Sequence, residues 1–118
     1  MLIAYIIVAS VFTVVLTISA RMKLVRAPVA VEVLGGVVGV PLRLFPILAV
    51  LEIAGAVGLL AGIGLEPLGV AAAVGLVAYF IAATSSHLRK RDLAAGHVVP
   101  PVMMLVISVV ALALRLAA

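Results

Sequence analysis

Four long stretches almost free of charge set the strongest limit on what this chain can form. They cover residues 2–20, 44–65, 68–86 and 98–116, and Glu52 and Arg115 are their only charged residues. A helix needs about 20 mostly apolar residues to cross about 30 Å of hydrocarbon. A spanning strand would need a closed barrel with a turn roughly every 10 residues. The sequence therefore predicts a single all-α membrane domain over residues 1–118, a bundle of four spanning helices.

The composition excludes a soluble globular protein. The 118 residues are 68% hydrophobic and 10% charged, and the mean hydropathy is +1.54. A soluble domain has about 45–50% apolar and about 25% charged residues. A chain this short cannot bury so much apolar surface by itself, so lipid must cover the remainder. Cysteine is absent, which excludes disulfides, thiolate metal sites and Fe–S clusters within this chain.

The segment 24–42 is apolar but carries charges, prolines and glycines, so a fifth span is the alternative. Four spans place the first and third loops on the same side of the membrane. Those loops hold seven of the eight basic residues, namely Arg21, Lys23, Arg26, Arg43, Arg89, Lys90 and Arg91. Cytoplasmic loops are enriched in Lys and Arg, which favours four spans. We therefore expect a cell-membrane protein with segment 24–42 as a short helix and turn at the interface, loops 1 and 3 cytoplasmic, and both termini outside.

The basic residues predict a contact with lipid. Lys23, Arg89, Lys90 and Arg91 form the expected basic rim of the bundle, which would attract anionic lipid head groups. No aromatic-rich or basic helical surface accompanies the net charge of +4, so nucleic acid is not an expected partner.

Small residues at a spacing of four favour close packing of the second and third spans. The relevant positions are Ala54, Gly58 and Gly62 in the second span, and the two pairs Ala71/Gly75 and Ala78/Ala82 in the third. Such residues let helix backbones approach closely in lipid. We expect a tight hairpin turning at Glu66-Pro67, and the same faces could serve a homo-oligomer.

Glu52 is a charged residue whose position inside a span is energetically unfavourable. It lies about 12 Å into its span, at 1.5 Å per residue, where a carboxylate costs a few kcal/mol. Counting the same depth along the other spans reaches Thr13, Tyr79 and Ser108, and no basic residue. We therefore expect a neutral Glu52 in a small apolar chamber with one phenol and two hydroxyls. Such a chamber suits a flat apolar ligand with polar handles, or else the network only stabilises the bundle.

Two histidines stand near one mouth of the predicted bundle. His87 closes the third span and His97 begins the fourth. His87 is either a polar boundary residue or a proton-exchange group between the chamber and water. No carboxylate stands at a ligand spacing nearby, so we expect no metal site.

Three motifs carry a resemblance to a known family. They are Lys23-Leu24 after the first span, the run 51–62 containing Glu52, and the run 83–89 containing His87. Together with four spans in this length, they resemble the DoxX-like family of small bacterial membrane proteins. The resemblance implies the four-span fold, with Lys23, Glu52 and His87 at the matching positions. It also implies a redox context, because founding members are associated with a quinone-reducing thiosulfate oxidoreductase.

We therefore expect an accessory subunit of a redox or quinone-linked membrane complex, not an enzyme on its own. A quinone or other lipid would bind near Glu52, and a membrane or peripheral oxidoreductase partner would carry the electrons. The candidate ligand contacts are Glu52, Tyr79, Thr13, Ser108 and His87. The alternative is a structural or assembly protein without a ligand. Weaker alternatives are a small-molecule transporter and a lipid-modifying enzyme using Glu52 as its acid or base.

Overall fold

The computed structural model describes residues 1–37, 39–89 and 95–118 and consists of helices and turns throughout these ranges. Four helices are long and apolar enough to cross a membrane. The chain is therefore an all-α, four-helix integral membrane bundle, as the hydropathy predicts. Its long helices are α1 (Leu2–Leu24), α3 (Phe45–Ala61, preceded by the 3₁₀ turn Leu42–Leu44), α4 (Glu66–Arg89) and α5 (Ala95–Ala117).

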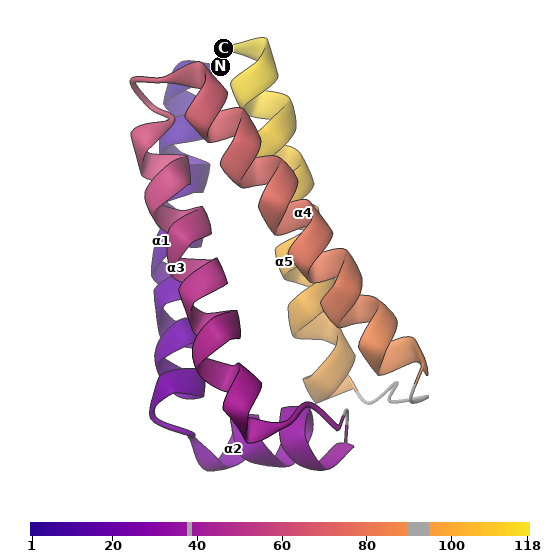
Figure 1. Cartoon of the computed structure of the whole chain (residues 1–118). Helices are drawn as coiled ribbons and strands as arrows, with labels where there is room; N and C mark the ends of the chain where they lie inside the picture. The colour runs from indigo at the N-terminus through magenta and orange to yellow at the C-terminus, as the bar shows by residue number, and fades with distance from the viewer. Residues whose placement is uncertain (38, 90–94) are drawn as a thin grey trace.

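The four helices form two antiparallel pairs. α1 packs along α3, α4 packs along α5, and α3 and α4 join the two pairs (Figure 1). The pairs meet near the chain termini and diverge toward the opposite end, where α2 lies. We call the first the closed end and the second the open end.

α1 extends four residues beyond its expected end at Ala20, and a specific hydrogen-bond pattern closes it there. The backbone N–H of Ala27 donates to Met22 O, and that of Arg26 donates to Lys23 O. Arg26 has φ 51°, so this is a Schellman ending with a left-handed residue just after the cap. Lys23 consequently lies within the last turn of the helix and not in a loop.

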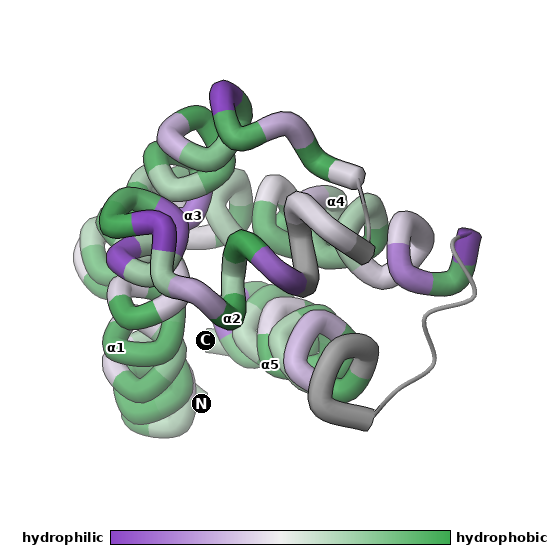
Figure 2. Tube along the Cα trace, turned by 90° about the horizontal axis from the view of Figure 1, so that it is seen from below, coloured by the Kyte–Doolittle hydropathy of each residue, from purple (hydrophilic) through white to green (hydrophobic). Residues whose placement is uncertain are grey.

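The segment between the first two spans is a short helix and turn, as expected. α2 (Pro28–Ala30) continues into a π-helical stretch, η1 (Val31–Val37). Viewed from the open end, α2 crosses between the pair α1/α3 and the pair α4/α5 (Figure 2). Ala30 is 8% exposed, so α2 packs onto the end of the bundle.

Two side chains from different helices stabilise the closed end. The Tyr5 hydroxyl donates to Leu59 O at 2.6 Å, and Arg115 Nε donates to Gly62 O at 2.7 Å. The Arg115 guanidinium carbon also lies 5.7 Å from the centre of the Tyr5 ring. These donors satisfy carbonyl groups at the end of α3, which its own helix leaves unpaired. Arg115, expected only as a terminal charge, is thus buried and joins α1, α3 and α5.

The hairpin of α3 and α4 packs through a different face of α4 than the sequence predicts. A Cβ atom placed on Gly62 would collide with Gly69, and one on Gly58 would lie 2.6 Å from Ala72 Cβ. The exposed face of α4 instead carries Ala71, Gly75, Ala78 and Ala82. The reason is the turn, which falls at residues 62–65, so that Glu66 and Pro67 begin α4. Proline fits there because the first helical N–H groups need no intrahelical partner.

Candidate functional site

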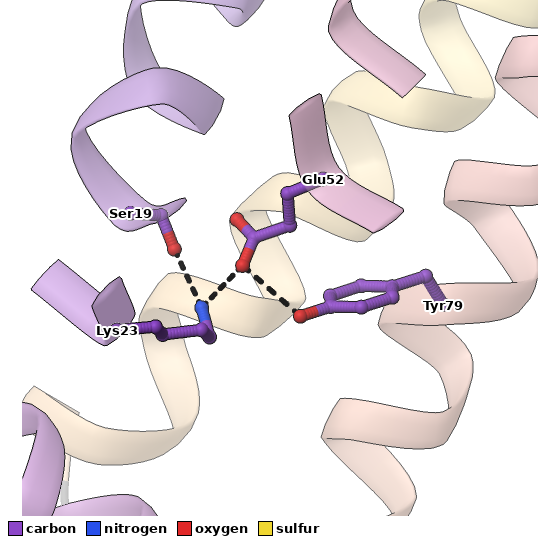
Figure 3. A network of polar contacts seen from close by, with 4 residues as sticks. All are labelled: Ser19, Lys23, Glu52 and Tyr79. Carbon is purple, nitrogen blue, oxygen red and sulfur yellow. Dashed lines mark hydrogen bonds and ion pairs between the residues drawn. The ribbon is translucent and has the colours of Figure 1, made fainter. Parts of the chain in front are cut away.

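An ion pair lies inside the bundle. Glu52 of α3 is fully buried, Lys23 of α1 is 9% exposed, and Lys23 Nζ contacts Glu52 Oε1. Lys23 Nζ also donates to Ser19 Oγ at 2.8 Å, and the Tyr79 hydroxyl of α4 donates to Glu52 Oε1 at 3.0 Å (Figure 3). Three helices therefore meet at one carboxylate.

The direction in which helical side chains lean explains this meeting. Each side chain on a helix tilts toward the N-terminus of its own helix. α1 and α3 are antiparallel, so Lys23 leans away from the open end while Glu52 leans toward it. Because the lysine stem is long, its ammonium group reaches the carboxylate from the last turn of α1.

The structure corrects the expected surroundings of Glu52. Lys23 was expected in the basic rim, with no basic residue at the depth of Glu52, but Lys23 is buried and paired with Glu52. Counting residues along each span ignored both the extended end of α1 and the lean of the side chains. The expectation of a neutral carboxyl rested on the depth of Glu52 and on the absence of a basic residue there, and the contact with Lys23 removes the second of these grounds.

Of the three polar residues expected beside Glu52, the structure brings only Tyr79 to it. Ser108 is buried, but its hydroxyl donates to Met104 O at 2.7 Å within α5. Thr13 is half-buried, and its hydroxyl has no hydrogen-bond partner within the described parts of the chain. Thr13 and Ser108 therefore lie apart from the network around Glu52.

A cavity of about 1140 Å³ lies between the two helix pairs. Its walls come from all four long helices and from α2, and most of its lining is aliphatic or glycine. Among the described residues, the polar lining side chains are Ser19, Lys23, Tyr79, Ser86 and His87. Glu52 does not line the cavity but lies behind Lys23 and Tyr79. A molecule in the cavity would thus contact the lysine and the phenol, and the carboxylate would act through them.

The remaining predicted polar residues lie near the open end. His87 is 3% exposed and lines the cavity, while Arg89 is exposed in the last turn of α4. The predictions for Lys90, Arg91 and the side chain of His97 fall outside the described residues. Within the described ranges, no three His, Asp or Glu side chains gather as metal ligands would.

Sequence reasoning missed Ser19 and Arg115 as parts of polar contacts. Ser19 precedes Lys23 by four residues, a spacing that places two side chains together on one helix face. That signal was available once Lys23 was known to be helical. No local signal pointed to Arg115, because its partners lie on α1 and at the end of α3.

The two oxygens of Glu52 have different surroundings. Oε1 accepts from both Lys23 and Tyr79, whereas Oε2 is buried and has no partner among the described residues. Lys23 has three N–H hydrogens, of which the described contacts use two. The site therefore combines a compensated charge with one spare donor at the wall of an apolar cavity.

Comparison with known proteins identifies the family. No curated protein and no solved structure matches the chain. The model of the DoxX-like family matches residues 7–111. This range contains the second and third spans, most of the first and fourth, and Lys23, Glu52, Tyr79 and His87. This small four-helix membrane protein therefore belongs to the DoxX-like family.

Proposed function

We propose that this membrane protein binds one lipophilic molecule near Glu52 and serves as an accessory subunit of a redox or quinone-linked membrane complex. The observation that carries the proposal is the apolar cavity of about 1140 Å³ with Lys23 and Tyr79 in its wall. Small-molecule sites are typically apolar clefts with a few convergent polar groups. Thr13 and Ser108 do not line this cavity, so the proposed contacts are Lys23, Tyr79 and His87.

The redox part of the proposal rests on the family resemblance. A quinone or a similar lipid would occupy the cavity, and a membrane or peripheral oxidoreductase would exchange electrons with it. The residues of this chain would bind and orient the molecule: Lys23 and Tyr79 would contact its polar end, and Glu52 would hold both of these side chains.

A second candidate is a structural or assembly protein without a ligand. The observation that favours it is that the Lys23–Glu52–Tyr79 network also connects α1, α3 and α4. Buried polar networks of this kind can define one packing arrangement of a bundle. The partner would then be another membrane protein or a second copy of this chain.

Mass spectrometry of the protein extracted gently from its native membrane distinguishes the two candidates. We expect one lipophilic molecule per chain in the wild type, and its loss in the double variant Lys23→Met with Glu52→Gln. That variant removes both charges together, so no lone charge is left buried. The matched control is Glu66→Gln, at an exposed position near the closed end, which should retain the molecule. A folded wild type carrying only a protein partner would support the assembly role instead.

We also infer that the open end faces the cytoplasm. Arg21, Arg26, Arg43 and Arg89 are exposed near this end, and Arg115 is at the other, which agrees with the positive-inside bias. Because the chain lacks cysteine, single-cysteine variants allow a direct test. Intact cells should protect Arg26→Cys from a membrane-impermeant thiol reagent and expose Glu66→Cys to it. The reverse labelling pattern would contradict the inferred orientation.

A further inference from the structure

We infer that the ligand of this cavity is an uncharged amphiphile. Its head accepts a hydrogen bond from Lys23, and its apolar chain lies along α3 and α4, where the cavity opens to the surrounding lipid. The inference rests on the proposed function, because it describes the ligand of the same cavity.

The hydrogen-bonding capacity of the polar wall defines the head group. Lys23 donates to Ser19 and to Glu52, which leaves one N–H group for a molecule in the cavity. The Tyr79 hydroxyl gives its hydrogen to Glu52, so its oxygen can only accept a further one. The head must therefore offer an acceptor to Lys23, and a hydroxyl on the same head could donate to Tyr79.

The charge balance favours an uncharged acceptor. Within the described lining, Lys23 is the only Lys, Arg, Asp or Glu side chain, and Glu52 already compensates its charge. A phosphate or carboxylate would place a second negative charge beside a buried carboxylate. In surroundings of low dielectric constant that arrangement is costly. A carbonyl oxygen, as in an ester or a quinone, uses the spare N–H group without this cost.

The shape of the cavity shows where the apolar chain would lie. Ala54 of α3 and Ala71, Gly75 and Ala78 of α4 line the cavity and are also exposed on the bundle surface. A Cβ atom placed on Gly75 would meet no heavy atom within 4 Å. The cavity is therefore open sideways along this face of α3 and α4, where a membrane protein contacts acyl chains.

The arrangement of the protein at the two ends of the cavity favours entry of a ligand from the bilayer. Gly62 and Gly69 are in contact at the closed end. At the open end α2 lies across the bundle, and Val29 and Ala30 belong to the cavity wall. The volume of about 1140 Å³ exceeds the roughly 300–1,000 Å³ of a typical small-molecule site, as a long apolar chain requires.

Single tryptophans can test the inference, because the chain has none of its own. Leu51→Trp puts the fluorophore in the cavity wall, and Val50→Trp puts it on the neighbouring exposed residue outside that wall. The variants are reconstituted in phosphatidylcholine vesicles. The quenching probes are a long-chain benzoquinone, a chain-brominated monoacylglycerol and a chain-brominated phosphatidic acid.

We expect at least one neutral probe to quench Leu51→Trp at a mole fraction about tenfold lower than it quenches Val50→Trp, which is the effect of roughly one hydrogen bond to a charged donor. Which neutral probe does so identifies the source of the carbonyl. Phosphatidic acid should quench both positions alike. Adding Lys23→Met with Glu52→Gln to Leu51→Trp should abolish the preference for the neutral probe.

Three results would overturn the inference: equal quenching of both tryptophans by the neutral probes, preferential quenching by phosphatidic acid, or an unchanged preference in the charge-free background. The proposed function has a separate test, because it fails only if the wild type extracts without a lipophilic molecule. A wild type that carries such a molecule but shows equal quenching would retain the proposed function and contradict this inference alone.

Discussion

Replacing Lys23 with Met should destabilise the protein by about 3–5 kcal/mol, the usual cost of removing one partner of a buried ion pair. Glu52 is fully buried, and this variant leaves its carboxylate in the bundle with Tyr79 as its only described partner. The reverse change, Glu52→Gln, should cost less. The Lys23 stem begins in the last turn of α1, so its ammonium group can turn toward the membrane interface, as lysines near helix ends do.

The double variant Lys23→Met with Glu52→Gln should recover most of the stability lost in Lys23→Met. Unfolding of the purified protein in detergent, by heat or denaturant, measures all three. Arg21→Met is the matched control, because Arg21 is an exposed cation on the same helix, and it should change stability by less than about 0.5 kcal/mol. A double variant whose loss equals the sum of the two single losses would show that the charges are not coupled.

Adding a single methyl group at Gly62 should be the most damaging small substitution at the closed end. A Cβ atom there would collide with Gly69 Cα, lie 2.6 Å from Gly69 N and lie 2.8 Å from Tyr5 Oη. Backbone atoms cannot move aside, so α3 and α4 must separate. Overpacking of this kind costs about 1–3 kcal/mol and occasionally more, and we expect Gly62→Ala at the upper end of that range.

A series of glycine variants tests whether the clash between α3 and α4 causes this loss of stability. At Gly69 a Cβ atom would meet Tyr5 Oη at 2.9 Å and Gly62 Cα at 3.0 Å, so Gly69→Ala should cost less than Gly62→Ala. At Gly75 it would meet open space, so Gly75→Ala should stabilise α4 by about 0.5–1 kcal/mol through helix propensity alone. The same unfolding measurement ranks the three, and any other order would contradict the packing described for this hairpin.

Local patterns in the sequence predicted much of the fold. The length and hydropathy of a segment suffice to predict a spanning helix, because the backbone groups of a lipid-exposed span must find their hydrogen-bond partners within the same helix. The four spans, the short helix after α1 and the unusual position of Glu52 were therefore predictable. The ends of the helices were less predictable. The Schellman ending at Arg26 and the start of α4 at Glu66 depend on backbone geometry that composition does not reveal.

Which residues of different helices contact each other was decided by the tertiary structure. Lys23 meets Glu52 because α1 extends to Leu24 and antiparallel side chains lean toward each other. Gly69, rather than Ala71, meets Gly62 because the turn ends one residue before Glu66. Arg115 reaches the end of α3 only because α5 returns to the closed end.

The sequence by itself thus determined that this chain is a four-helix membrane protein with one buried carboxylate, since insertion into lipid depends on each segment separately. Only the tertiary structure decided that Lys23 pairs with that carboxylate and that the small residues of α4 line a cavity. The register and divergence of the two helix pairs arise from contacts between residues far apart in the chain, and no local pattern records them.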